Sequence, residues 1–321
     1  MIFFRSLKNR HSRRQAQLHL EKQKLENMRK FKTTFLYMLL SLLTIQLHAL
    51  DKPSIKTRVI GTGQPVIMIP GLTCDGAVWD STIKSMGSGY QFHVMTLPGF
   101  AGNAPLEDLA AGFFTQVQKM VLDYIDQNKI KNPIIIGHSL GGFMALNIAI
   151  ERPSLPSKLV IVDSLPFLTA MQVPTATEES SMPFAETMKT QMMASQVQTL
   201  EQRADYQRTM LKSMILDSAN IEIATQWSLD SDMGTIAQSM YELYTTDLRE
   251  DLGKIKVPTL VLGAWVAYQP YGSTRESTLA IYTGQYENLA NVTVDMTDIG
   301  NHFIMWDDPE FFNNWLTKFL N

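Results

Sequence analysis

Short apolar runs alternate with segments of helical spacing along most of this 321-residue chain. The runs contain few polar residues, so they are predicted to be strands covered on both faces, as in parallel sheets. These strand segments are 65–71, the first part of 92–102, 132–139, 158–164, 258–264 and 291–297. Helical spacing is found between them, for example over 106–128 and 307–320. The pattern predicts an α/β fold with a mostly parallel sheet and helices on both faces.

The alternation stops between about 165 and 252, where the pattern is helical throughout and nine of the 19 methionines lie. We expect this region to be a helical cap inserted over the carboxyl ends of the strands. Two methionine pairs, Met188/Met192 and Met210/Met214, have i, i+4 spacing. They are predicted to pack the cap onto the body, and the alternative is that they form an adaptable wall of an acyl or aromatic pocket.

Residues 28–49 have the layout of a secretory signal peptide, with three early basic residues, an apolar run over 35–45 and a small residue, Ala49, at the end. The apolar run is short for a membrane span. We therefore expect cleavage after Ala49 and an exported domain, periplasmic or secreted, over 50–321 without stable membrane insertion. The alternative is an uncleaved N-terminal anchor.

Residues 1–27 are polar and strongly basic, which fits nothing that precedes a signal peptide. We expect Met28 to be the true start and 1–27 to be a mis-assigned extension. Basic residues are concentrated at this end, with 10 Lys and Arg against 2 Asp and Glu in 1–49. The remaining 18 basic and 29 acidic residues leave 50–321 with a net charge of −11. This balance argues against a nucleic-acid partner.

One motif carries a specific chemistry: Gly137-His138-Ser139-Leu140-Gly141 matches G-x-S-x-G between a predicted strand and a predicted helix. The motif needs small residues beside the serine because the strand turns sharply into the helix there. The turn exposes the hydroxyl beside a helix N-terminus, whose N–H groups favour a developing oxyanion. Ser139 is predicted to be a nucleophile, and the alternative is an ordinary serine in a glycine-rich turn.

A serine nucleophile needs a base, and only three histidines lie within 50–321. His93 is inside a predicted strand and is expected to be a core or strand-end residue. His138 neighbours Ser139 but is expected to point elsewhere from the turn. His302 follows the last predicted strand and precedes the last helix, so its loop can hold an imidazole over the nucleophile. We predict His302 to be the base.

The chain from about 55 to 320 resembles the α/β-hydrolase superfamily. The matching pieces are MIPGL, LPGFAG, GHSLGG, PTLVLGA and NHFIMWDDPEFF, in the family order of serine before histidine. The resemblance implies an oxyanion hole formed by the backbone N–H groups of Leu72 and Leu140. It implies no cofactor and no metal. The one cysteine, Cys74, lies in the same loop as Leu72 and is interpreted as a buried thiol that packs the loop.

The carboxylate that should orient His302 is missing from its usual place, because the position that aligns with the family acid is at or near Ala267. Asp163, at the end of the preceding predicted strand, is the first candidate because neighbouring strand ends are about 5 Å apart. Glu276 is an alternative acid. A dyad or an inactive site is the third possibility.

The pattern favours hydrolysis of a small ester or lactone through an acyl-enzyme on Ser139. Alternatives are an aminopeptidase of the proline iminopeptidase type, or a C–C hydrolase. The aminopeptidase would need acidic cap residues to bind an amine, and Glu178, Glu179 and Glu186 are the candidates. A hypothesis of a different class is a binding protein on a catalytically impaired hydrolase scaffold, which the missing acid motivates. In each case the expected partner is a small molecule.

Overall fold

The computed structural model describes residues 22, 24, 26, 28–32 and 53–321. The chain divides into two compact units, 1–52 and 53–321. In the first unit residues 28–32 are helical. The predicted extension over 1–27 and the predicted signal peptide over 28–49 lie mostly outside the described residues. None of the helices in the described part of the chain combines the length and the apolar character that crossing a bilayer requires.

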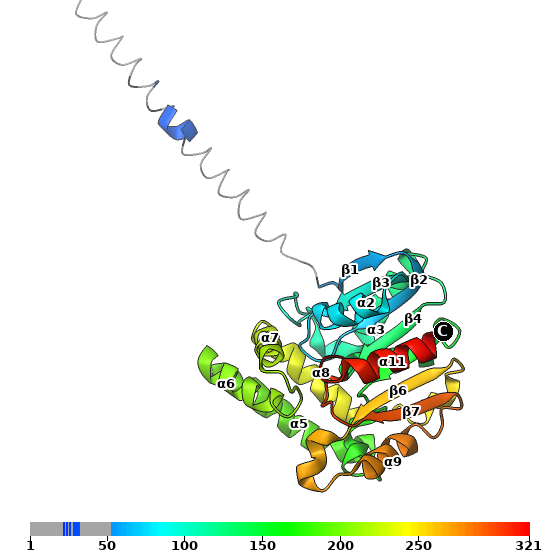
Figure 1. The fold of residues 1–321 in the computed structure, drawn as a ribbon. Coiled ribbons are helices and arrows are strands. Elements are labelled where there is room, and N and C mark those ends of the chain that lie inside the picture. The colour runs from blue at the N-terminus through cyan, green and yellow to red at the C-terminus, as the bar shows by residue number, and fades with distance from the viewer. Residues whose placement is uncertain (1–21, 23, 25, 27, 33–52) are drawn as a thin grey trace, which may run out of the picture. The chain divides into compact units, whose positions relative to one another are not determined.

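Residues 53–321 form a seven-stranded sheet in the order β1-β3-β2-β4-β5-β6-β7 (Figure 1). Each neighbouring pair is parallel except β1 with β3, which is antiparallel. The strands are β1 Lys56–Gly61, β2 Gly63–Ile69, β3 Gly89–Thr96, β4 Ile134–His138, β5 Lys158–Val162, β6 Thr259–Ala264 and β7 Val292–Thr297. The predicted mostly parallel sheet is confirmed. The prediction omitted β1, whose edge position leaves its residues half-buried or exposed, so no apolar run marks it.

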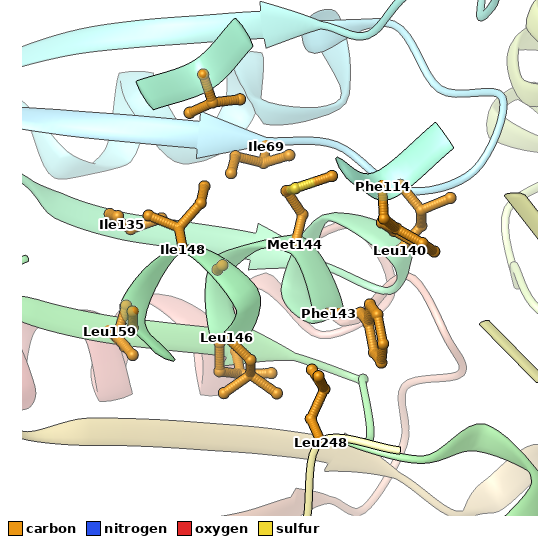
Figure 2. Close-up of a cluster of buried hydrophobic side chains, with 14 of the residues drawn as sticks. Ile69, Phe114, Ile135, Leu140, Phe143, Met144, Leu146, Ile148, Leu159 and Leu248 are labelled. Atoms are coloured by element: carbon orange, nitrogen blue, oxygen red, sulfur yellow. The ribbon is translucent and has the colours of Figure 1, made fainter. Parts of the chain in front are cut away.

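Successive side chains of β2 enter two separate cores, because side chains alternate between the faces of a strand. Ile67 and Ile69 belong to the core formed with α3 (Phe113–Gln127), α4 (Leu140–Glu151) and α9 (Arg275–Gln285). Figure 2 shows part of this core, where Met144 of α4 points toward Ile69 of β2. Phe143 of the same helix points toward Phe114 of α3, with the ring centroids 4.9 Å apart. Val66 and Met68 belong to the other core, with α2 (Asp80–Met86) and α11 (Pro309–Leu320). Helices therefore cover both faces, as expected.

The helical insertion lies between β5 and β6 and confirms the predicted cap. Its helices are α5 Glu178–Ala194, α6 Leu200–Leu211, α7 Ser218–Leu229 and α8 Met233–Thr245. The helix predicted over 307–320 is confirmed as α11, and a short helix, α10 (Ile304–Asp307), precedes it. Asp308 lies between them with non-helical backbone angles, φ −137° and ψ 64°, and caps α11 by accepting the Phe311 N–H at 3.2 Å.

Candidate active site

Ser139 occupies a strained turn at the carboxyl end of β4, at the N-terminus of α4. Its φ of 53° and ψ of −121° are outside the regions that non-glycine residues usually adopt. The turn is possible because backbone segments approach closely on both sides. A Cβ on Gly137 would lie 2.2 Å from the Gly141 oxygen, and one on Gly141 would lie 2.2 Å from the Ile69 oxygen. The motif therefore requires glycine at both positions, because any side chain there would clash with neighbouring backbone.

His302 and Asp163 meet at the carboxyl edge of the sheet. The His302 Nδ1 lies 2.6 Å from Asp163 Oδ2, although 139 positions separate the two residues in sequence. Asp163 directly follows β5, and its positive φ of 45° turns the chain away from the strand. When the carboxylate is ionised it can only accept, so His302 donates from Nδ1 and its Nε2 is the atom left to act as a base.

The second oxygen of Asp163 is held by two other donors. Its Oδ1 accepts the Ala264 backbone N–H at 2.8 Å and the Tyr282 hydroxyl at 2.6 Å. Burial raises the pKa of Tyr282 well above its usual range, and the nearby Asp163 carboxylate adds to this effect. Tyr282 therefore stays protonated and donates. These two bonds fix the carboxylate so that Oδ2 faces His302.

The other acids considered from the sequence lie elsewhere. Glu276 is exposed in the first turn of α9, where the hydrogen bond from its own backbone N–H and then the Thr274 side chain lower its pKa. Ala267, the position without a carboxylate, lies in the short helix η6 (Val266–Tyr271) and lines the cavity described below. The structure brings Asp163 to His302 and leaves Glu276 outside that cavity.

The loop 70–72 lies against the turn that holds Ser139. A Cβ on Gly71 would lie 3.3 Å from the Ser139 Cβ. Leu72 follows this contact, and Leu140 is the first residue of α4. Neither the Leu72 nor the Leu140 N–H donates to another acceptor within residues 53–321. Both are therefore available to an oxyanion at Ser139.

Two other candidate side chains of the sequence analysis, Cys74 and His93, are buried. Burial, followed by the charge of Asp75, raises the pKa of the Cys74 thiol to about 12. The thiol donates to the Leu72 oxygen at 3.4 Å, so it remains protonated and packs this loop. His93 is on β3, where its Nδ1 is 2.8 Å from the Tyr124 hydroxyl. It takes no part in the site.

A cavity of about 820 Å³ opens between the strand ends and the helical insertion. Ser139, Asp163 and His302 lie in its wall together with five methionines of the insertion, Met171, Met192, Met210, Met214 and Met240. Two aromatic side chains of η6, Tyr268 and Tyr271, also line it. Among the described residues, no Lys, Arg or Glu lines the cavity, and no group of three side chains has a metal-binding arrangement. The cavity is thus mainly apolar and carries no charge of its own besides the Asp163–His302 pair.

Comparison with known proteins decides the family. Residues 66–315 match the profile described as "Alpha/beta hydrolase family". The match covers the sheet from within β2 to β7, the insertion and His302, and leaves out β1. This chain belongs to the alpha/beta hydrolase family.

Proteins named as esterases or as a lactonase are similar to this chain at low identity. The "Pimeloyl-[acyl-carrier protein] methyl ester esterase" of Vibrio cholerae is 26% identical over 215 residues, which are 64% of this chain and 76% of that protein. An esterase from Exiguobacterium antarcticum has a TM-score of 0.68 at 21% identity, and the alignment covers 84% of this chain and 97% of the esterase. The enol-lactonase from Burkholderia xenovorans has a TM-score of 0.65 at 15% identity, covering 83% and 96%. The two structures share the fold.

Sequence reasoning missed one histidine of this hydrolase site. His138 does not point away from the site: its Nε2 lies 3.0 Å from the backbone oxygen of His302, and the two rings are 4.6 Å apart. A carbonyl oxygen only accepts, so Nε2 carries the proton of a neutral ring. Burial and then the charge of His302 hold the pKa of His138 well below its usual range. His138 therefore ties the turn of Ser139 to the loop of His302.

A second contact joins the same loop to the insertion. Asp307 accepts the Asn301 N–H at 3.1 Å and the Leu216 N–H at 3.0 Å. The Phe303 N–H donates to the Met214 oxygen at 3.2 Å. The loop of His302 is thus held from both sides. Local sequence contains no signal for Tyr282, His138 or Asp307 in these roles, because their partners are distant along the chain.

Proposed function

We propose that this alpha/beta hydrolase is a serine esterase in which Ser139, His302 and Asp163 form the catalytic triad. The observation that carries the proposal is the 2.6 Å contact between His302 and a buried carboxylate, beside a serine on a strained turn. A binding module has no need for this combination. The esterase relative from Vibrio cholerae supports ester hydrolysis as the reaction class.

In the proposed mechanism the Ser139 hydroxyl attacks the ester carbonyl while His302 Nε2 takes its proton. Asp163 stabilises the resulting imidazolium and keeps the ring in the productive tautomer. The backbone N–H groups of Leu72 and Leu140 bind the tetrahedral oxyanion. His302 then gives its proton to the leaving alcohol, and water attacks the acyl-enzyme by the same steps. The loss of one oxyanion donor typically costs about 10²–10³ in kcat.

The cavity supports a substrate that is neutral and mainly apolar. Its methionine wall can adapt to several acyl or alkyl shapes, since methionine is unbranched and polarizable. A substrate that carries a phosphate group is usually bound through Arg or Lys side chains. No Lys or Arg among the described residues lines this cavity. We therefore propose small-molecule esters, with lactones as the closest variant of the same reaction.

The aminopeptidase alternative has less support. Glu178, Glu179 and Glu186 do not line the cavity, so none is in position to hold a substrate amine beside Ser139. Glu178 accepts the Asp247 N–H at 2.8 Å. A C–C hydrolase would use the same nucleophile and base, and the substrate screen below distinguishes it.

The test is a substrate screen with a matched pair of variants. Full-length protein is assayed on p-nitrophenyl esters, lactones, aminoacyl anilides and a vinylogous diketone, and is labelled with a fluorophosphonate probe. We expect labelling and ester turnover in the wild type. Ser139→Ala should lose both, with kcat reduced by up to about 10⁶. Ser213→Ala, which removes another serine lining the cavity, should keep both. Turnover within tenfold of wild type in Ser139→Ala would refute the nucleophile.

We also propose export, with cleavage after Ala49. The proposal is supported by the basic, apolar and small-residue order of 28–49. Mass spectrometry of the protein recovered from expressing cells tests it: an N-terminus at Leu50 is expected, and retention of 28–49 on recovered protein contradicts it.

A further inference from the structure

Large apolar side chains are exposed in one part of residues 53–321. Fourteen such side chains are exposed there, and twelve of them lie in the insertion or in η6. The twelve are Val173, Met182, Phe184, Met193, Val197, Leu200, Tyr206, Met210, Leu216, Ile223, Tyr268 and Tyr271. Scattered exposed apolar residues are ordinary, but their concentration in one region indicates a site of interaction.

Six of these twelve side chains also line the cavity that contains Ser139. They are Val173, Phe184, Tyr206, Met210, Tyr268 and Tyr271. Each is open to solvent and faces the cavity, so each belongs to the mouth. Tyr271 is 86% exposed and Phe184 is 57% exposed. We call these six residues the rim. The route from solvent to Ser139 is therefore apolar from its outer edge inward.

The apolar exposure continues beyond the rim on the segment that joins α5 and α6. Val197, in the short helix η4 (Ser195–Val197), is 92% exposed, and Leu200 at the start of α6 is 62% exposed. Neither lines the cavity. They contact neither the core nor the substrate path, so the packing of residues 53–321 does not account for them.

The charge of the insertion restricts what can cover this surface. Residues 165–252 contain 13 acidic and 5 basic residues. A surface of this balance repels an anionic partner such as a membrane rich in acidic lipid. A second protein seated on the rim would close the mouth of the cavity. A lipid surface without net charge is not repelled by the acidic side chains. It also supplies the substrate at the mouth of the cavity instead of closing it.

We propose that the rim, with Val197 and Leu200, docks onto the surface of a lipid aggregate without net charge, such as a zwitterionic phospholipid bilayer, and that ester chains pass from it into the cavity. This inference rests on the proposed esterase function for the nature of the substrate. Docking would bury exposed apolar side chains and leave the acidic ones in water. Docking would also bring the ester to Ser139 through the mouth of the cavity, which the apolar side chains of the rim line.

The test measures binding apart from turnover. Full-length Ser139→Ala is incubated with phosphatidylcholine vesicles, with and without 30% phosphatidylglycerol, and the bound fraction is measured by sedimentation. We expect binding to phosphatidylcholine that weakens as the anionic lipid is added. Adding Val197→Ser and Leu200→Ser together should lower the partition coefficient at least tenfold. The matched control is Val59→Ser with Ile299→Ser, the two exposed large apolar residues of 53–321 that lie outside the region, and it should bind as before.

The outcomes separate the possibilities. Absence of binding to phosphatidylcholine, equal loss in both double variants, or stronger binding to the anionic vesicles overturns the proposal. A dimer of the parent chain that dissociates in the Val197/Leu200 variant also overturns it, because a second copy then covers the surface. All four substitutions are at exposed sites, where a change of side chain usually has little effect on stability, so the variants should fold. Binding without ester turnover in the wild type would leave docking intact and refute the esterase function alone.

Discussion

Replacement of Asp163 by asparagine is the sharpest test of the acid in this site. The change keeps the size of the side chain, and asparagine tolerates the positive φ of 45° at this position. It removes the charge that stabilises the imidazolium of His302. The structure further predicts which way the new amide will face.

An amide has one accepting oxygen and one donating NH₂ group. The Ala264 backbone N–H points at the Oδ1 position from 2.8 Å and cannot become an acceptor. The amide oxygen must therefore take this position, where the Tyr282 hydroxyl also donates. The NH₂ group then replaces Oδ2, 2.6 Å from His302 Nδ1, and donates to it. His302 is forced to carry its proton on Nε2, the atom that must accept from Ser139.

The expected loss in kcat is about 10²–10⁴, because both the charge and the tautomer are wrong. This corresponds to about 2.7–5.4 kcal/mol of transition-state stabilisation. Asp163→Ala leaves the imidazole free to adopt either tautomer, so we expect Asp163→Asn to be no more active than Asp163→Ala despite its better fit. Glu276→Gln, at an exposed site, should stay within about twofold of wild type.

The assay is steady-state hydrolysis of the best p-nitrophenyl ester by each variant, with thermal unfolding as the check on folding. Near wild-type kcat in Asp163→Asn together with loss of activity in Glu276→Gln would make Glu276 the acid. If neither change lowered kcat, His302 would work without a carboxylate, and Asp163 would have no role in the triad. An Asp163→Asn variant that exceeds Asp163→Ala by tenfold or more would contradict the amide orientation.

Three further outcomes follow from contacts in and beside the site. Tyr282→Phe removes one donor to Asp163 while the Ala264 N–H remains, so kcat should fall about 10–100-fold with KM nearly unchanged, and an equal rise in KM would contradict a positioning role. Iodoacetamide at pH 8 should not reduce activity, because the pKa of the Cys74 thiol is raised to about 12; rapid inactivation lost in Cys74→Ser would show a reactive thiol. Because the pKa of His138 is depressed in the folded protein, the unfolded chain binds a proton at this histidine first as the pH falls. The contribution of neutral His138 to the free energy of unfolding is therefore present above about pH 6.5 and is lost below it, by at most about 1.4 kcal/mol per pH unit. Urea unfolding of wild type and His138→Asn at pH 5.5 and 7.5 measures this, and an equal pH dependence in both would rule it out.

The sequence by itself determined the fold class and the positions where chemistry was to be sought. Apolar runs that alternate with helical spacing predict buried parallel strands, because a strand covered on both faces has no polar side. The break in this alternation after residue 164 predicts the helical insertion. The motif around Ser139 is local, since a tight strand-to-helix turn needs Gly137 and Gly141 within two positions of the serine. Such features depend on neighbours in the chain.

Tertiary structure alone decided which groups meet at the carboxyl edge of the sheet. Asp163 and His302 are 139 positions apart, and Tyr282 is 119 positions from Asp163. From the sequence, Asp163 was one of three hypotheses for the acid that orients His302. No local sequence feature distinguishes an aspartate that orients a histidine from one that holds a loop. The strand order β4-β5-β6-β7 sets these ends side by side, and the packing of α9 directs the Tyr282 hydroxyl to the carboxylate. Hydrogen bonds act over about 3 Å between atoms whose separation along the chain is immaterial, so only the folded arrangement of strands and helices determines them.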